Sequence, residues 1–177
     1  MSTLKPNAPS PGPWTVGRER ILELIDAGEL ERVAVNREHA QGLLLRARRH
    51  LKTAHRLVVD DPEGAYTLLY DASRLAMTAA LAVQGLRPTT RGGHIVVGDA
   101  LRAQRGPHDA VGKLYSRLRR TRHEVEYPGL DYEPIAVEEA EEALEDAEYI
   151  VQEMTLFVPK LGPFKAHFSS SPPKLLP

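Results

Sequence analysis

Residues 61–85 read DPEGAYTLLYDASRLAMTAALAVQG and predict one long helix. Asp61 offers a side-chain acceptor to the first helical amide groups, and Pro62 stands where no amide donor is needed. Apolar and small residues then recur at helical spacing as far as Gln84, and Gly85 ends the helix. The predicted buried face consists mostly of small residues, which lets neighbouring helices pack closely. It comprises Ala65, Leu68, Leu69, Ala72, Leu75, Ala76, Ala79, Ala80 and Val83.

Helical patterns also lie on both sides of this segment. A short helix is predicted at 14–27, and a longer one follows Asn36, a residue type that caps helices. Glycine and proline separate three further predicted helices, at 95–105, 107–127 and 134–157. Strand-like alternation is nearly absent. The sequence therefore predicts an all-α protein, an up-and-down antiparallel bundle of four to five main helices plus a short N-terminal helix.

The length of 177 residues suits one domain, predicted at 14–158, between two tails. Residues 1–13 and 159–177 are rich in proline and serine, and we expect them to be disordered. The absence of cysteine excludes a disulfide scaffold, an Fe–S cluster and a thiolate nucleophile. No apolar run approaches the about 18 residues of a membrane span, and no signal-peptide pattern is present. We therefore expect a soluble, cytoplasmic protein with no membrane partner.

Charge is strongly segregated along the chain, although the net charge is only −1. Basic side chains gather at 46–56 and at 102–122, whereas 138–153 is acidic and contains no Lys or Arg. Two interpretations remain open. The charges form solvated faces joined by ion pairs of little energetic weight, or the basic residues form a surface for a phosphate backbone, whose affinity falls as salt rises.

One arginine lies on the predicted buried stripe of the helix at 107–127. At 100° per residue, that stripe consists of Val111, Leu114, Tyr115, Leu118 and Val125. Arg122 falls within it, and Arg119, His123 and Glu126 flank Arg122 at offsets of three or four residues. A cation on a buried stripe is costly unless it is paired or faces a groove. Arg122 therefore either pairs with an acid such as Glu126 and fixes packing, or lines a functional cleft.

From residue 36 to residue 157 the sequence resembles the HEPN family (higher eukaryotes and prokaryotes nucleotide-binding). The likeness rests on the Asp61–Pro62 helix start, the small-residue helix after it, the turn Gly92-Gly93-His94, and the segment RLRRTRHEVEYP at 117–128. The resemblance implies a dimer in which Arg and His side chains of both copies face one cleft. Active members are metal-independent ribonucleases, often of toxin–antitoxin or defence systems. Other members bind nucleotides or partner proteins without cleavage.

The signature of the active members is an Arg followed by a polar residue, with a His after four to six intervening residues. One register pairs Arg117 with His123 and has Leu118 in the polar place. The other begins at Arg122, followed by polar His123, and ends at Tyr127. The second register is favoured because Arg122 lies on the interface-like stripe and its polar place is filled.

By this resemblance, Arg122 and Arg119 clamp phosphate, since a planar guanidinium holds two oxygens. His123 is the proton carrier, and Tyr127 is an orienting hydroxyl. The favoured catalytic residues are thus Arg122, His123 and Tyr127, and the further RNA-binding residues are Arg117, Arg119 and Arg120. No metal or cofactor is implied.

The partners that the resemblance implies are a second copy of the chain, RNA or a nucleotide, and a cognate antitoxin or nucleotidyltransferase-like protein. Two functions follow as hypotheses. The first is an RNA- or nucleotide-directed protein, with metal-independent endoribonuclease activity as its catalytic form. The alternative is a non-catalytic HEPN-like module that dimerises or binds a partner, with Arg122 in a structural role.

Overall fold

The computed structural model describes residues 11–165, and this part of the chain is mostly helical. Its elements confirm the all-α bundle predicted from the sequence, with one N-terminal and five main helices. The helices are α1 (Arg18–Asp26), α2 (Arg37–Leu57), α3 (Pro62–Gln84), α4 (Ile95–Arg105), α5 (Ala110–Glu126) and α6 (Val137–Phe157), followed by the 3₁₀ turn η1 (Val158–Lys160).

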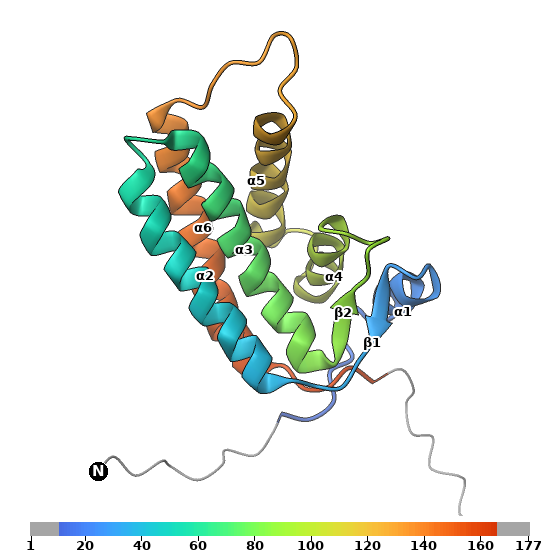
Figure 1. Cartoon of the computed structure of the whole chain (residues 1–177). Coiled ribbons are helices and arrows are strands. Elements are labelled where there is room, and N and C mark those ends of the chain that lie inside the picture. The colour runs from blue at the N-terminus through green and yellow to red at the C-terminus, as the bar shows by residue number, and fades with distance from the viewer. Residues whose placement is uncertain (1–10, 166–177) are drawn as a thin grey trace, which may run out of the picture.

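Helix α3 forms the centre of the bundle. The Gly64 amide donates to the Asp61 side chain at 2.9 Å, and Gly85 (φ 73°) ends the helix in the left-handed conformation that glycine adopts without strain. Helices α2 and α6 run alongside α3, while α5 and α4 pack on its other flank (Figure 1). The predicted bounds of this helix are confirmed, and so is its predicted buried face except at Leu68, which is only partly buried. Its fully buried alanines are Ala65, Ala72, Ala76, Ala79 and Ala80.

Two short strands, not predicted from the sequence, connect the N-terminal region with the end of α3. Strands β1 (Leu30–Arg32) and β2 (Leu86–Pro88) pair antiparallel, with Glu31 opposite Arg87. Arg87 donates to Glu31 at 2.7 Å on the exposed side of the pair. Each strand has three residues, which is too short for an alternating pattern to be visible in the sequence.

The first helix is shorter than predicted. Helix α1 begins at Arg18 rather than at Trp14, after Gly17 in the left-handed conformation (φ 71°). Trp14 instead forms a parallel β-bridge with Phe164, and its ring meets that of Phe157 edge-on at 5.7 Å. Residues 106–109 form the turn out of α4, so α5 also begins later than the predicted start at 107.

The chain beyond α6 packs against the bundle. Leu161 has no exposed surface, and Phe164 is buried as well. The Phe164 amide donates to the Gln84 carbonyl at 2.9 Å, and the Trp14 amide to the Pro163 carbonyl at 2.9 Å. Residues 159–165, predicted to belong to a disordered tail, are therefore part of the fold. The rest of the two predicted tails, residues 1–10 and 166–177, lies outside the described residues.

We expect Leu161→Ala to lower the free energy of unfolding by about 2–5 kcal/mol, because truncating a fully buried leucine leaves a cavity. Leu130→Ala is the matched control. Leu130 is fully exposed in the α5–α6 loop, and its truncation should cost less than about 0.5 kcal/mol. Urea unfolding followed by circular dichroism measures both changes. Equal midpoints for wild type and Leu161→Ala would show that the packing of Leu161 against the bundle adds nothing to stability.

Candidate functional site

Arg117 already has an acidic partner. Its Nε donates to the Asp146 carboxylate of α6 at 2.9 Å, and a second guanidinium nitrogen contacts the same oxygen. The hydrogen bond to Asp146 raises the pKa of Arg117. The Asp146 side chain is only 10% exposed, so it needs this counter-charge. Arg117 therefore fixes α5 to α6.

His123, Tyr127 and Arg120 lie on the outward side of α5. All three are exposed, and the rings of His123 and Tyr127 lie 5.0 Å apart at an angle of 47°. The helical positions of His123 and Tyr127 lie about 100° and 140° around the axis from Arg122. Within one chain, this exposed pair therefore faces away from the side of α5 on which Arg122 lies.

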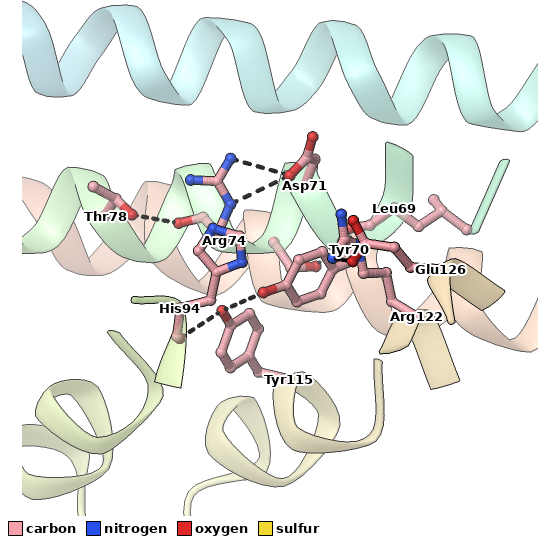
Figure 2. Close-up of polar contacts among 10 residues, drawn as sticks. Leu69, Tyr70, Asp71, Arg74, Thr78, His94, Tyr115, Arg122 and Glu126 are labelled. Carbon is pink, nitrogen blue, oxygen red and sulfur yellow. Dashed lines mark hydrogen bonds and ion pairs between the residues drawn. The ribbon is translucent and has the colours of Figure 1, made fainter. Parts of the chain in front are cut away.

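Arg122 lies on the inward side of α5, as the periodicity predicted. Its guanidinium carbon is 5.3 Å from the centre of the Tyr70 ring of α3, a cation–π contact. Its Nη1 also pairs with the Glu126 carboxylate one turn along α5 (Figure 2). The side chain of Arg122 is 24% exposed and that of Glu126 is 38% exposed. The predicted pairing with Glu126 is thus present, at a place that solvent reaches.

Two buried tyrosines, Tyr70 and Tyr115, connect Arg122 with the start of helix α4. The rings of Tyr70 and Tyr115 stack at 5.7 Å, and their hydroxyl oxygens lie 3.3 Å apart. The Tyr115 hydroxyl donates to the backbone carbonyl of His94 at 3.1 Å, so the Tyr70 hydroxyl donates to Tyr115. Burial raises the pKa of both phenols, which therefore stay protonated at neutral pH.

His94 joins this site from the turn between α3 and α4. Its ring lies 5.8 Å from the Tyr70 ring, tilted by 45°. Desolvation lowers the pKa of His94, and the positive charges of Arg74 and Arg122 lower it further. Arg74 in turn is held by Asp71, with Nη2 donating at 3.0 Å. His94 was not predicted as a site residue, and the only sequence signal was its place in the Gly92-Gly93-His94 turn.

The turn that carries His94 is held by close backbone packing. A Cβ on Gly92 would lie 2.4 Å from the Glu29 carbonyl oxygen, so only glycine fits there. The Thr89 hydroxyl donates to the Gly28 carbonyl at 2.6 Å and accepts from the Gly92 amide at 3.3 Å. His94, which follows Gly92 and Gly93, is the N-cap residue of α4. The turn thus sets where His94 enters the site.

The face formed by α3, the His94 turn and α5 carries an excess of positive charge. Arg74 and Arg122 each pair with a carboxylate, those of Asp71 and Glu126. Arg119 lies on the same side of α5, where its charge acts on Tyr115, and it forms no ion pair with any described residue. Of the six predicted site residues, the structure therefore brings Arg119 and Arg122 to this face and directs the other four elsewhere.

Within residues 11–165, no three or more histidine, aspartate or glutamate side chains are grouped so that they could hold a metal ion. Nor does any helix in that part of the chain combine the length and the apolar character needed to cross a membrane.

Residues 40–156 match the family model of the HEPN domain. The match covers well over half of the chain and includes every residue of the face just described. The chain therefore belongs to the HEPN family, which relates it in general terms to nucleotides and RNA. Comparisons with curated proteins and with solved structures give no match.

We expect Tyr115→Phe to lower the free energy of unfolding by about 1–3 kcal/mol, because the buried Tyr70 hydroxyl loses its partner. Tyr70→Phe removes the same hydrogen bond from its other end. The double variant should therefore lose less stability than the two single variants added together. Urea unfolding of the four proteins measures this coupling. Fully additive losses would mean that the two hydroxyls do not interact.

Proposed function

We propose that this protein binds RNA at the face of α5 that carries Arg119 and Arg122, and cleaves it there without a metal ion. The observation that supports this most is the position of Arg122. Its guanidinium is held over the Tyr70 ring yet remains 24% exposed. A positioned planar guanidinium matches the geometry of two phosphate oxygens better than a mobile one, because less freedom is lost on binding.

A phosphate group can replace Glu126 as the partner of Arg122. Both side chains of that pair reach solvent, and a pair of this kind is worth about 1 kcal/mol or less. Two parallel hydrogen bonds to a phosphate are stronger than an ordinary neutral hydrogen bond. Arg119 adds a second cation, with no described acidic group to displace. The two arginines therefore form the phosphate clamp of the proposed site.

Cleavage follows from attack of a ribose 2′-hydroxyl on the adjacent phosphorus. Arg122 stabilises the charge that develops on the phosphate oxygens. His123 supplies a proton to the leaving 5′ oxygen, and Tyr127 orients the strand with its hydroxyl. Both residues are exposed at the same end of α5 but face away from Arg122 within one chain, so the proposal assigns these roles to His123 and Tyr127 of a second copy at the shared cleft of a dimer.

The proposed setting is that of the active family members, a toxin–antitoxin or defence system in the cytoplasm. HEPN domains commonly dimerise and bind nucleotides. A second copy is therefore the first proposed partner, because it would bring the same groups to a shared cleft. A cognate antitoxin or nucleotidyltransferase-like protein is the second.

The alternative function is a non-catalytic module that dimerises or binds a partner protein. It is favoured by the ion pairs that already engage two of the predicted arginines, Arg117 with Asp146 and Arg122 with Glu126. In this function the arginines hold helices in place, and His123 and Tyr127 belong to an ordinary exposed surface.

RNA cleavage in EDTA separates the two functions. We expect wild-type protein to cut single-stranded RNA, and Arg122→Ala to cut it about 100-fold more slowly or worse, because the developing charge loses its donor. His123→Ala should also lose most activity. Lys113→Ala is the matched control, since Lys113 is exposed on the opposite side of α5. No cutting by any form on several RNA substrates would contradict the nuclease step and favour the non-catalytic module.

Binding is tested with 2′-O-methyl RNA, which lacks the attacking hydroxyl. The dissociation constant, measured by fluorescence anisotropy over a range of salt, should weaken as salt rises. Arg119→Ala and Arg122→Ala should each reduce the slope of log affinity against log salt by about 0.7, the value for one lost contact to a single strand. Lys113→Ala should leave the slope unchanged. Equal slopes for all four proteins would show that RNA does not lie on this face.

A further inference from the structure

His94 and Arg122 approach the same aromatic ring from different parts of the chain. The His94 ring lies 5.8 Å from the Tyr70 ring, and the Arg122 guanidinium carbon lies 5.3 Å from its centre. Figure 2 shows the two side chains on either side of Tyr70. An imidazole, which accepts and releases protons near neutral pH, is thus brought to the proposed phosphate clamp.

The backbone of His94 is fixed while its side chain is left accessible. Tyr115 donates to its carbonyl at 3.1 Å, and the Gly92 amide is held by Thr89 at 3.3 Å. His94 is an exposed residue, and its ring nitrogens make no hydrogen bond to any residue of the described chain. A group positioned in this way is ready to bond a ligand rather than the protein itself.

Desolvation, and after it the charges around His94, favour the neutral form of this side chain. Arg74 from α3 and Arg122 from α5 face it, and with desolvation they outweigh the nearest carboxylates. The pKa of His94 therefore lies below the ordinary value, and most of the molecules carry an unprotonated ring nitrogen at pH 7. The titratable and charged groups that face His94 from the two packed helices are Tyr70, Asp71, Arg74, Tyr115, Arg122 and Glu126.

We propose that His94 accepts the proton of the attacking ribose 2′-hydroxyl when RNA is cleaved at this face. The proposal rests on the proposed function and adds to it a catalytic residue outside α5. The 2′ oxygen forms a bond to phosphorus as its proton passes to the free ring nitrogen of His94. The bond from phosphorus to the 5′ oxygen breaks, and that oxygen takes up a proton from His123 of the second copy, which the proposed dimer brings to the cleft. The products are a 2′,3′-cyclic phosphate and a 5′-hydroxyl, and both histidines re-equilibrate with solvent.

The pH profile of cleavage distinguishes this role from a structural one. A base must be unprotonated, so the wild-type rate should fall as the pH drops through the pKa of His94, which desolvation holds below the ordinary histidine value. His94→Gln should cut RNA about 100-fold more slowly or worse. It should also lose this acid limb, while binding 2′-O-methyl RNA as tightly as the wild type. His108→Gln is the matched control, because His108 is exposed in the α4–α5 turn, and it should behave as the wild type.

A second variant, His94→Ala, tests whether the loss of cleavage comes from a folding defect or from the missing side chain. In His94→Ala, added imidazole should restore part of the cleavage, and it should do nothing for Arg122→Ala. A misfolded protein would not respond to a small base. Recovery of activity therefore assigns proton transfer to the missing side chain, and no recovery in a His94→Ala protein with wild-type circular dichroism counts against the assignment.

The outcomes separate this inference from the function on which it rests. If the wild type neither binds nor cuts RNA, the proposed function fails, and the inference with it. If the wild type binds without cutting, or if His94→Gln keeps the wild-type rate and pH profile, the inference is overturned while RNA binding stands. A loss of RNA binding in His94→Gln as large as its loss of cutting would make His94 a binding residue and would also overturn the proposal.

Discussion

The close packing of α3 against its neighbours is the constraint on which this structure depends. Five alanines of α3 have no exposed surface, and a larger side chain at these positions would force the surrounding helices apart. The one buried serine of α3, Ser73, donates to the Leu69 carbonyl of its own helix at 3.0 Å and needs no partner across the interface. Large side chains of α3 such as Tyr66, Met77 and Leu81 are buried as well. Among the large side chains, Tyr70 stacks on Tyr115 of α5 and contacts Arg122, and the site is built around its ring.

The stacked pair Tyr70–Tyr115 links the core of the bundle to the surface that carries Arg122 and His94. Because the Tyr115 hydroxyl also holds the His94 carbonyl, one hydrogen-bonded chain joins α3, α5 and the start of α4. The face that would meet a ligand thus rests on buried rings instead of on a free loop, and Arg122 and His94 contact the same ring. Groups supported in this way lose little freedom when they bind or react.

Local signals made most of the fold predictable, and long-range contacts account for what was missed. Asp61 and the proline after it marked the start of α3 correctly. Helical periodicity placed Arg122 on the inward side of α5. The sequence prediction placed Trp14 in a helix, because its β-bridge with Phe164, far along the chain, leaves no local pattern in the sequence. His94 was missed for the same reason, since only the folded tyrosine pair brings residue 94 close to residue 122.

The two arginine pairs of α5 differ in how deeply the acidic partner is buried. The acid that holds Arg117 is almost buried, with 10% of its side chain exposed, so removing Arg117 from Asp146 would leave a buried charge uncompensated. The acid that holds Arg122 is 38% exposed and can be rehydrated when a phosphate takes its place. Burial of the partner, and not of the arginine, therefore decides which guanidinium is free to exchange. By this criterion Arg117 is fixed in the helix packing, whereas Arg122 is the arginine that can exchange its partner, as the proposed function requires.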